Sequence, residues 1–403
     1  MYSYDYFEFI LSLSKGKTNH KHTEITKKMT IEETLYTIAL TRISGVNQAS
    51  MLDAYKRAGS AQAIFEHKDS IRELLPDASD RFVSAIRNFH DPLERAKVEL
   101  EYAVKKQIQC LCFNDEKYPQ RLRECPDAPL VLYYRGNADL NQKRIVSVVG
   151  TRQCTQYGKD ALRNFFAGLQ TYCPNVLVVS GLAYGIDICA HREALKNNYE
   201  TVAVLAHGLD TLYPYAHRET ATEMISHGGL MTEYMSGISA DKPHFLARNR
   251  IVAGMSDATI VVESASHGGS LVTARIAQDY NRDVFAFPGN INADSSQGCN
   301  NLIRDNAAGL ISNVEDFIHA MKWDDEQVRS EKMKMGIERS LFMEYTGEEQ
   351  IVVDILTKAG DLQINVLAVK SGMNISKLSA LMFELEMKGV VKLMPGGVYH
   401  LYQ

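Results

Sequence analysis

The spacing of hydrophobic positions changes along the chain and divides the sequence into segments. Between residues 30 and 105, apolar side chains such as Leu35 and Ile38 recur at helical spacing. The pattern breaks at Ser44-Gly45-Val46-Asn47 and then resumes. These features predict a small helical domain over residues 29–105.

The break in this helical segment has two interpretations. Ile43-Ser44-Gly45-Val46 between two short helices is typical of a helix-hairpin-helix, in which backbone amides can hold a DNA phosphate. The usual second glycine is missing, because Asn47 follows Val46. A purely structural role for this SAM/helix-hairpin-helix-like domain is therefore the favoured interpretation.

From about residue 106, apolar and β-branched runs alternate with segments of helical spacing. Strands that are apolar throughout and alternate with helices indicate a parallel sheet covered on both faces. We therefore predict an α/β fold, with a Rossmann-like, mostly parallel sheet, over residues 106–318. The expected strands are 108–113, 130–134, 145–149, 176–179, 202–206, 259–262 and 284–287, and another short strand ends at Thr232-Glu233-Tyr234.

Three further segments flank these two domains. Residues 1–28 contain the basic stretch KGKTNHKHTEITKK and are expected to form a mobile N-terminal extension. Residues 319–348 are charged and predict a linker. Residues 349–403 show three helical segments and then a hairpin, which is typical of a winged-helix domain. Its third helix, 376–387, is poor in positive charge, so a protein contact or a structural role is as plausible as DNA contact.

Composition limits the classes of function. Lys and Arg number 44 against 49 Asp and Glu, a net charge of −5, so any nucleic-acid binding requires a local basic patch. No apolar run reaches the ~18 residues that a transmembrane helix needs. The seven cysteines lack a CxxC pair, which argues against a zinc site or a disulfide framework. With no signal-peptide pattern at the start, the expected location is cytoplasmic.

Glycine-rich turns follow three of the predicted strands. They are Gly150-Thr151-Arg152, Ser180-Gly181 and Gly268-Gly269-Ser270. Because the carboxyl ends of parallel strands meet at one edge, these turns should gather backbone amides and Arg152 around an anion such as phosphate. None of them matches G-x-G-x-x-G or the G-x-x-x-x-G-K-[ST] loop, so NAD binding and ATP hydrolysis lose support. We expect no cofactor and no metal.

Two other groups of residues carry candidate chemistry. Asp187 and His191 are four residues apart and share a helix face, which permits a catalytic role or, with the greater weight, a structural one. Cations and an aromatic ring fall together at the start of a later helix, and this combination suits a single strand with stackable bases. Its members are Lys242, Phe245, Arg248 and Arg250.

Motifs in a fixed order resemble the DNA-processing protein A (DprA/Smf) family. The similarity is close over about 106–318 and looser in the flanking domains. The motifs are YPQRL (118–122), PLVLYYRG (129–136), VGTR (149–152), SGLAYGID (180–187) followed by Ala190-His191, LAHGLD (205–210), RNRIVAG (248–254), GSLVTA (269–274) and RDVFAFPG (282–289).

This resemblance implies a single-stranded-DNA-binding recombination mediator. It would protect incoming DNA in natural transformation, load RecA, act without nucleotide hydrolysis and form a homodimer through the Rossmann-like domain. Arg152 matches the family's DNA-contacting arginine, and Ser180-Gly181 and Gly268-Gly269-Ser270 match its phosphate-contacting loops. Gly185, Asp187, His191, Glu263 and Thr273 are expected to shape the pocket.

The sequence departs from the family at two places. The position after Tyr213-Pro214 is often basic in the family but is Tyr215 here, so Tyr215 is expected to stack on a base and His217 or Arg218 to supply charge. Asn306-Ala307 replaces a frequent glycine-alanine near the surface that resembles the dimer side.

Two other functions remain open. A nucleotide-cleaving enzyme of the phosphoribohydrolase type would use Glu233 or Glu263 as its acid. An adaptor for RecA alone would not bind DNA by itself.

Overall fold

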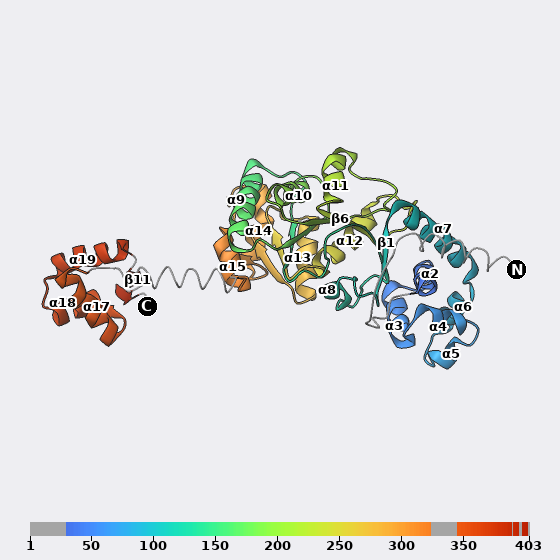
Figure 1. Ribbon diagram of the computed structural model, residues 1–403, viewed down its shortest axis with the longest axis horizontal. Coiled ribbons are helices and arrows are strands. Elements are labelled where there is room, and N and C mark those ends of the chain that lie inside the picture. Colours follow the sequence, from blue (N-terminus) through green and yellow to red (C-terminus); the bar gives the residue numbers. More distant parts are fainter. Residues whose placement is uncertain (1–29, 324–344, 389, 395–396, 402–403) are drawn as a thin grey trace, which may run out of the picture. The chain divides into compact units, whose positions relative to one another are not determined.

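The computed structural model describes residues 30–323, 345–388, 390–394 and 397–401 (Figure 1). The predicted extension 1–28 and most of the predicted linker lie outside these ranges. The chain separates into two compact units, Met1–Asp324 and Asp325–Gln403, which are described in turn. The expected boundaries of the individual domains stay predictions.

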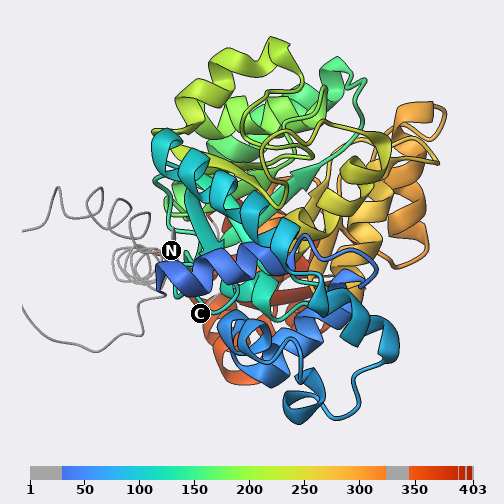
Figure 2. The ribbon, with the colours of Figure 1, turned by 90° about the vertical axis from the view of Figure 1, so that its right-hand side faces the viewer.

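Short helices form the beginning of the first unit, and Figure 2 shows them in blue to teal. Thr30 begins the first helix, because its side chain accepts a hydrogen bond from the Glu33 amide at 3.1 Å. The Glu33 carboxylate turns inward and accepts the Ala61 amide at 2.7 Å, so it caps a later helix. The helices are α2 (Ile31–Leu40), α3 (Gln48–Ala58), α4 (Ala61–Glu66), α5 (Ile71–Leu74), α6 (Asp80–Arg87) and α7 (His90–Lys106).

A nine-stranded sheet forms the centre of the first unit, in the order β1-β2-β6-β5-β4-β3-β7-β8-β9. The pairs β1–β2 and β2–β6 are antiparallel, and the other pairs are parallel. The predicted Rossmann-like, mostly parallel sheet is thereby confirmed. The strands are β1 (Gln109–Cys112), β2 (Val131–Gly136), β3 (Ile145–Val149), β4 (Leu177–Ser180), β5 (Thr201–Val204), β6 (Gly228–Thr232), β7 (Ala258–Val261), β8 (Asp283–Ala286) and β9 (Gly309–Leu310).

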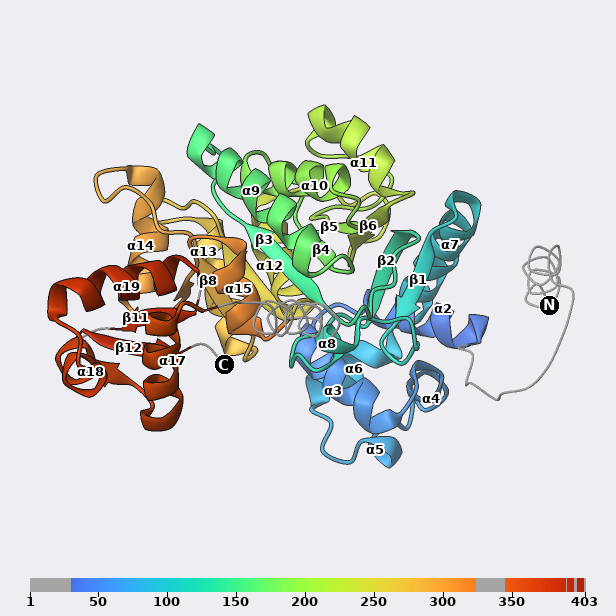
Figure 3. The same ribbon diagram turned by 60° about the vertical axis from the view of Figure 1, so that its left-hand side comes forward.

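Helices cover both faces of this sheet, because alternate strand residues point to opposite sides. On β3, Val146 and Val148 pack in a cluster with α9, α10 and α15, whereas Ile145 and Val149 pack in the cluster that holds α12 and α13 (Figure 3). The helices are α8 (Gln120–Arg123), α9 (Gln156–Tyr172), α10 (Ile186–Lys196), α11 (Arg218–Met224), α12 (Lys242–Gly254), α13 (Gly269–Asp279), α14 (Gln297–Arg304) and α15 (Val314–Met321), with two 3-10 turns, Tyr215–His217 and Asp294–Ser296.

The strand order reverses at β3. From β3 the chain moves outward to β4 and β5 on one side, and it later returns to place β7 on the other side. The connections after β3 and β7 therefore diverge and leave a crevice at the carboxyl edge of the sheet. Ligands bind at such a point in open α/β sheets.

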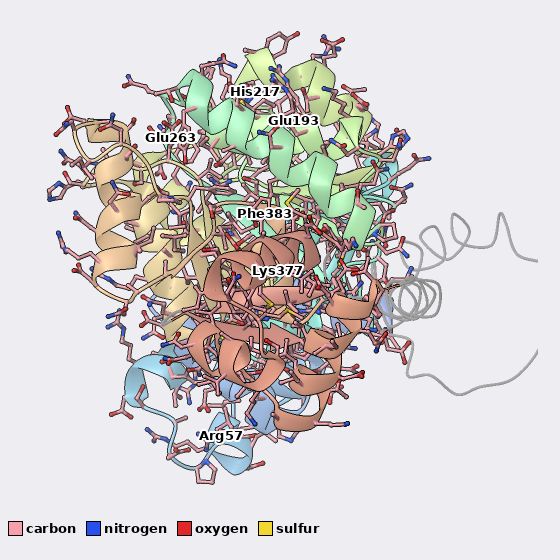
Figure 4. The ribbon with its side chains drawn as sticks, turned by 90° about the vertical axis from the view of Figure 1, so that its left-hand side faces the viewer. Arg57, Glu193, His217, Glu263, Lys377 and Phe383 are labelled. Carbon is pink, nitrogen blue, oxygen red and sulfur yellow. The ribbon has the colours of Figure 1, made fainter. Side chains whose placement is uncertain are left out.

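The second unit has the three helices and hairpin that the sequence predicts, and it is a winged-helix domain. Thr346 and Glu349 form a reciprocal capping box at the start of its first helix. Phe383 lies exposed on α19 (Figure 4). The elements are α17 (Gly347–Ala359), β10 (Leu362–Gln363), α18 (Ile364–Ser371), α19 (Ile375–Met387), β11 (Val391–Met394) and β12 (Val398–Leu401), with the three strands in one sheet.

Within the described ranges, no helix has the length and apolar character that crossing a membrane would require.

Candidate nucleic-acid interface

A cleft of about 700 Å³ opens at the carboxyl edge of the sheet, where the strand order reverses. It lies among the loops after β3 and β7 and the first turns of α12 and α13. Ten residues that the sequence singles out line it: Gly150, Arg152, Asp187, Lys242, Phe245, Arg248, Gly268, Gly269, Ser270 and Thr273.

Arg152 and Phe245 face one another in this cleft. The guanidinium carbon of Arg152 lies 5.1 Å from the centre of the Phe245 ring. Arg152 is exposed and forms no ion pair with any part of the chain that the structure describes. Its charge is therefore available to a ligand, while the ring holds it in place.

Tyr213 extends the aromatic surface beside Phe245. The two ring centres are 5.8 Å apart, and about half of Tyr213 is exposed. The Tyr213 amide donates to Nε2 of the buried His207 at 3.1 Å, which fixes this loop. Sequence reasoning missed Tyr213 as a site residue, because only the fold brings it next to α12.

The glycine turn at the start of α13 leaves backbone amides open to the cleft. Gly268 is the N-cap of this helix, and no side chain caps it. A Cβ on Gly269 would meet only the Asn249 amide nitrogen, at 3.9 Å. Free amides at a helix N-terminus bind anions. The Ser270 hydroxyl donates internally to Ser264 Oγ at 2.9 Å, so the amides of this turn are its main anion-binding groups.

Lys242 adds a second exposed cation to the lining of the cleft. It is the first residue of α12, and Asp241 caps that helix by accepting the His244 amide at 2.8 Å. The cleft therefore has two exposed cations, the uncapped N-terminus of α13 and aromatic rings in one place, with the Asp241 carboxylate also in its lining. His267, Asn249 and Ser264 also line it, and sequence reasoning did not select them.

Arg248 is buried beneath this cleft. Its guanidinium donates to the carbonyl oxygen of Gly181 at 2.7 Å and to that of Val204. Burial lowers its pKa, although the nearby Asp187 opposes this effect and Arg152 adds to it. Arg248 is therefore a structural cation with little surface for a ligand.

The Ser180-Gly181 turn holds Arg248 where the sequence predicts a phosphate. A Cβ on Gly181 would lie 2.3 Å from Arg248 Nη2. Ser180 is fully buried and its hydroxyl donates to the Val148 carbonyl oxygen at 2.6 Å. This burial does not fit the expected phosphate contact for either residue, and both instead support the floor of the cleft.

Asp187 lines the cleft near Arg248, whereas His191, one turn further along α10, is outside the lining. Burial raises the pKa of Asp187, and the Arg248 charge opposes this rise. His191 Nδ1 is 2.7 Å from Thr201 Oγ1, and burial lowers the pKa of His191 to about 3. The imidazole is therefore neutral near pH 7, bonded to Thr201 rather than to Asp187.

Gly185 permits the close packing that shapes the cleft. Its φ is +79°, and a Cβ there would lie 2.1 Å from the Thr151 carbonyl oxygen. Gly150 also permits close packing, since a Cβ added at this position would lie 2.5 Å from the Ile186 side chain. The sequence assigns Gly150 to ligand approach, whereas the structure shows that it admits α10 against the loop after β3.

Arg250 points away from the cleft and joins the helical domain to the sheet. It forms an ion pair with Glu233, and both side chains are nine-tenths buried. It also donates to Gln48 Oε1 at 2.9 Å and to the Asp127 carbonyl oxygen at 2.7 Å. Arg250 and Arg248 sit two residues apart on α12, so they point in different directions.

Glu263 caps α9. Its carboxylate accepts the Thr155 amide at 2.8 Å and the Thr155 hydroxyl at 2.7 Å. Neither Glu263 nor Glu233 lines the cleft. Both carboxylates that the enzyme interpretation would use are thus engaged in structural contacts.

The loop after β5 places the remaining predicted residues outside the cleft lining. Tyr215 is 68% exposed, and Arg218 Nη1 donates to its hydroxyl at 3.0 Å. His217 is buried, with Nδ1 2.8 Å from the Leu182 carbonyl oxygen. Tyr215 and Arg218 therefore offer surface near the cleft, and His217 does not. No group of three or more His, Cys, Asp or Glu side chains that could hold a metal occurs among the residues described.

Family models match most of the two folded units. The model described as DNA recombination-mediator protein A matches residues 109–322, and the model described as DprA winged helix domain matches residues 344–397. The first match alone spans slightly more than half of the chain.

Individual proteins of this family are also similar to the chain in sequence and in fold. DNA processing protein DprA of Streptococcus pneumoniae is 40% identical over 260 residues, which are 63% of this chain and 90% of that protein. Protein Smf of Escherichia coli K12 is 32% identical over 295 residues, 72% of this chain and 76% of that protein. The X-ray structure of the Streptococcus pneumoniae protein matches with a TM-score of 0.59 and 30% identity, over 74% of this chain and 98% of that one. This chain belongs to the DNA recombination-mediator protein A family.

Proposed function

We propose that the cleft binds single-stranded DNA and that the protein is a recombination mediator. The observation that carries this proposal is the exposed Arg152 stacked on Phe245 beside the open N-terminus of α13. Cations and free amides suit phosphates, whereas exposed rings suit unpaired bases. Bases paired in a duplex would not present their faces to these rings.

The contact set differs from the one the sequence suggests. Arg152, Lys242 and the amides of Gly268 and Gly269 hold phosphates, and Phe245 with Tyr213 stacks on bases. Tyr215 and Arg218 continue this surface along the strand. Ser180, Gly181 and Arg248 are buried and support the floor of the cleft. His191, Arg250 and Glu263 are buried outside its lining.

We further propose that the protein forms a homodimer, loads RecA onto the bound strand and acts in natural transformation. The family description as a recombination mediator supports a recombinase partner. Among the described residues, the edge strand β9 pairs with β8 alone and exposes Leu310, and Ile291 in the segment after β8 is 82% exposed. This edge is our candidate dimer surface. A cytoplasmic location follows from the proposed partners.

Binding of labelled oligonucleotides tests the DNA contact. Arg152→Ala should weaken single-strand binding about tenfold or more for all sequences alike, since it removes a charge-assisted hydrogen bond. The slope of log affinity against log salt should fall by about 0.7 for the lost phosphate contact. The control is Arg163→Ala, which removes an exposed arginine from α9. Unchanged binding by Arg152→Ala would refute the assignment.

Two further assays separate the other functions. Release of free base from nucleoside monophosphates would favour a phosphoribohydrolase, against the structural roles of Glu233 and Glu263. An adaptor for RecA would show no DNA binding until RecA is added.

A further inference from the structure

Two cysteines lie close together, and one of them, Cys154, follows Arg152 by two residues in the chain. Cys154 belongs to the segment between β3 and α9, and Cys189 belongs to α10. Their sulfur atoms are 3.9 Å apart, and both residues are half-buried. In contrast, Cys112, Cys125, Cys173 and Cys299 are buried.

We propose that Cys154 and Cys189 form an oxidisable pair, which closes to an intramolecular disulfide by exchange with a low-molecular-weight disulfide. A disulfide requires sulfur atoms about 2.05 Å apart. The two segments are already joined next to the cysteines, because the Ile186 amide donates to the Thr151 carbonyl oxygen at 3.1 Å. The sulfurs therefore approach mainly by side-chain rotation and a small shift of the loop.

The two cysteines have different roles in this exchange. Burial raises the pKa of Cys189 to about 11, and the adjacent Cys154 adds to this rise, so Cys189 is a poor first nucleophile. The Cys154 thiolate attacks one sulfur of the small disulfide, forms a mixed disulfide and releases one thiolate. Cys189 then loses its proton to solvent, attacks the Cys154 sulfur and expels the second thiolate. Two protein thiols are oxidised, and one small disulfide is reduced to two thiols.

Glutathione disulfide and the full chain provide the test. After incubation under native conditions, remaining thiols are alkylated, and the protein is analysed by intact mass and by peptide mapping without reduction. We expect the loss of two alkylation sites and a peptide that links Cys154 to Cys189. Dithiothreitol should restore both sites. The measurement does not involve DNA. Its outcome is therefore independent of whether the cleft binds single-stranded DNA.

Single substitutions trap the intermediate. Cys189→Ser should accumulate a glutathione adduct on Cys154, because the second attack is lost. Cys110→Ser changes the remaining half-buried cysteine and should behave as the parent does. The proposal is overturned if the parent retains both alkylation sites, if its mixed disulfide at Cys154 persists, or if the link joins other cysteines.

Discussion

The guanidinium of Arg248 rests directly on the backbone of Gly181, with no room for a side chain between them. A Cβ on Gly181 would lie 2.3 Å from Nη2, and Arg248 also donates to the Gly181 carbonyl oxygen. An internal cation thereby occupies a turn whose sequence is typical of anion binding. This contact forms the floor of the cleft. It also predicts that a side chain at position 181 would destabilise the fold.

Gly181→Ala should destabilise the protein by about 1–3 kcal/mol, because the new methyl group collides with a guanidinium that is enclosed on all sides. The urea midpoint of unfolding measures this change. Gly269→Ala is the matched control, since its Cβ enters open space at the start of a helix. Equal midpoints for Gly181→Ala and the parent would contradict the close packing.

Phe245→Leu should weaken single-stranded DNA binding while preserving the fold. The leucine keeps an apolar side chain but removes the ring face that supports Arg152, and stacking contributes about 1–3 kcal/mol per base. Fluorescence anisotropy with a labelled oligonucleotide measures the loss. Tyr157→Leu, which changes an exposed aromatic residue of α9 outside the cleft, should bind as the parent does. Equal losses in both variants would argue against stacking at Phe245.

His191 should make stability depend on pH. Its pKa in the folded protein is about 3, below the ordinary value of 6.5, so the unfolded chain binds the proton more readily. Its contribution is fully present above pH 6.5 and is lost progressively as the pH falls toward 3, by at most about 1.4 kcal/mol per pH unit.

The raised pKa of Asp187 acts in the opposite direction, since the folded state takes up that proton first on acidification. Comparison of the parent with His191→Gln separates the two groups. The urea midpoint at pH 7 minus the midpoint at pH 5 should be more positive for the parent than for the variant. A difference of the same size in both proteins would exclude His191 as the cause.

Glu263→Ala should destabilise the fold by about 1–3 kcal/mol, because the amide and hydroxyl of Thr155 lose their acceptor at the start of α9. Thermal unfolding measures the loss. The exposed Glu315→Ala on α15 serves as the control. If Glu263→Ala left stability unchanged but abolished release of base from a nucleotide, the enzyme interpretation would replace the structural one.

The sequence was sufficient to predict the sheet, because its parallel strands are buried on both faces and read as continuous apolar runs. It could not predict β9 or β10, each only two residues long and without an apolar run. It also contains a local signal for the first helix start, because a glutamate follows Thr30 three residues later. It could not show that Glu33 would turn away to cap α4, because Ala61 lies 28 residues later.

The same limit applies to the site. The turns and cations that line the cleft are visible as local motifs. Which of them remain open depends on contacts between distant residues, such as Arg248 with Gly181 across 67 positions. Tyr213 gives no local signal at all, since its relation to Phe245 exists only in three dimensions.

Helix α12 links the cleft to the helical domain. Lys242 and Phe245 occupy its first turn, and Arg250, about 12 Å further along the axis than Lys242, is tied to Gln48. An α-helix of this length moves as a stiff rod. A displacement of the N-terminal helices at Gln48 would therefore reach Lys242 and Phe245 in the lining of the cleft through a single rigid element.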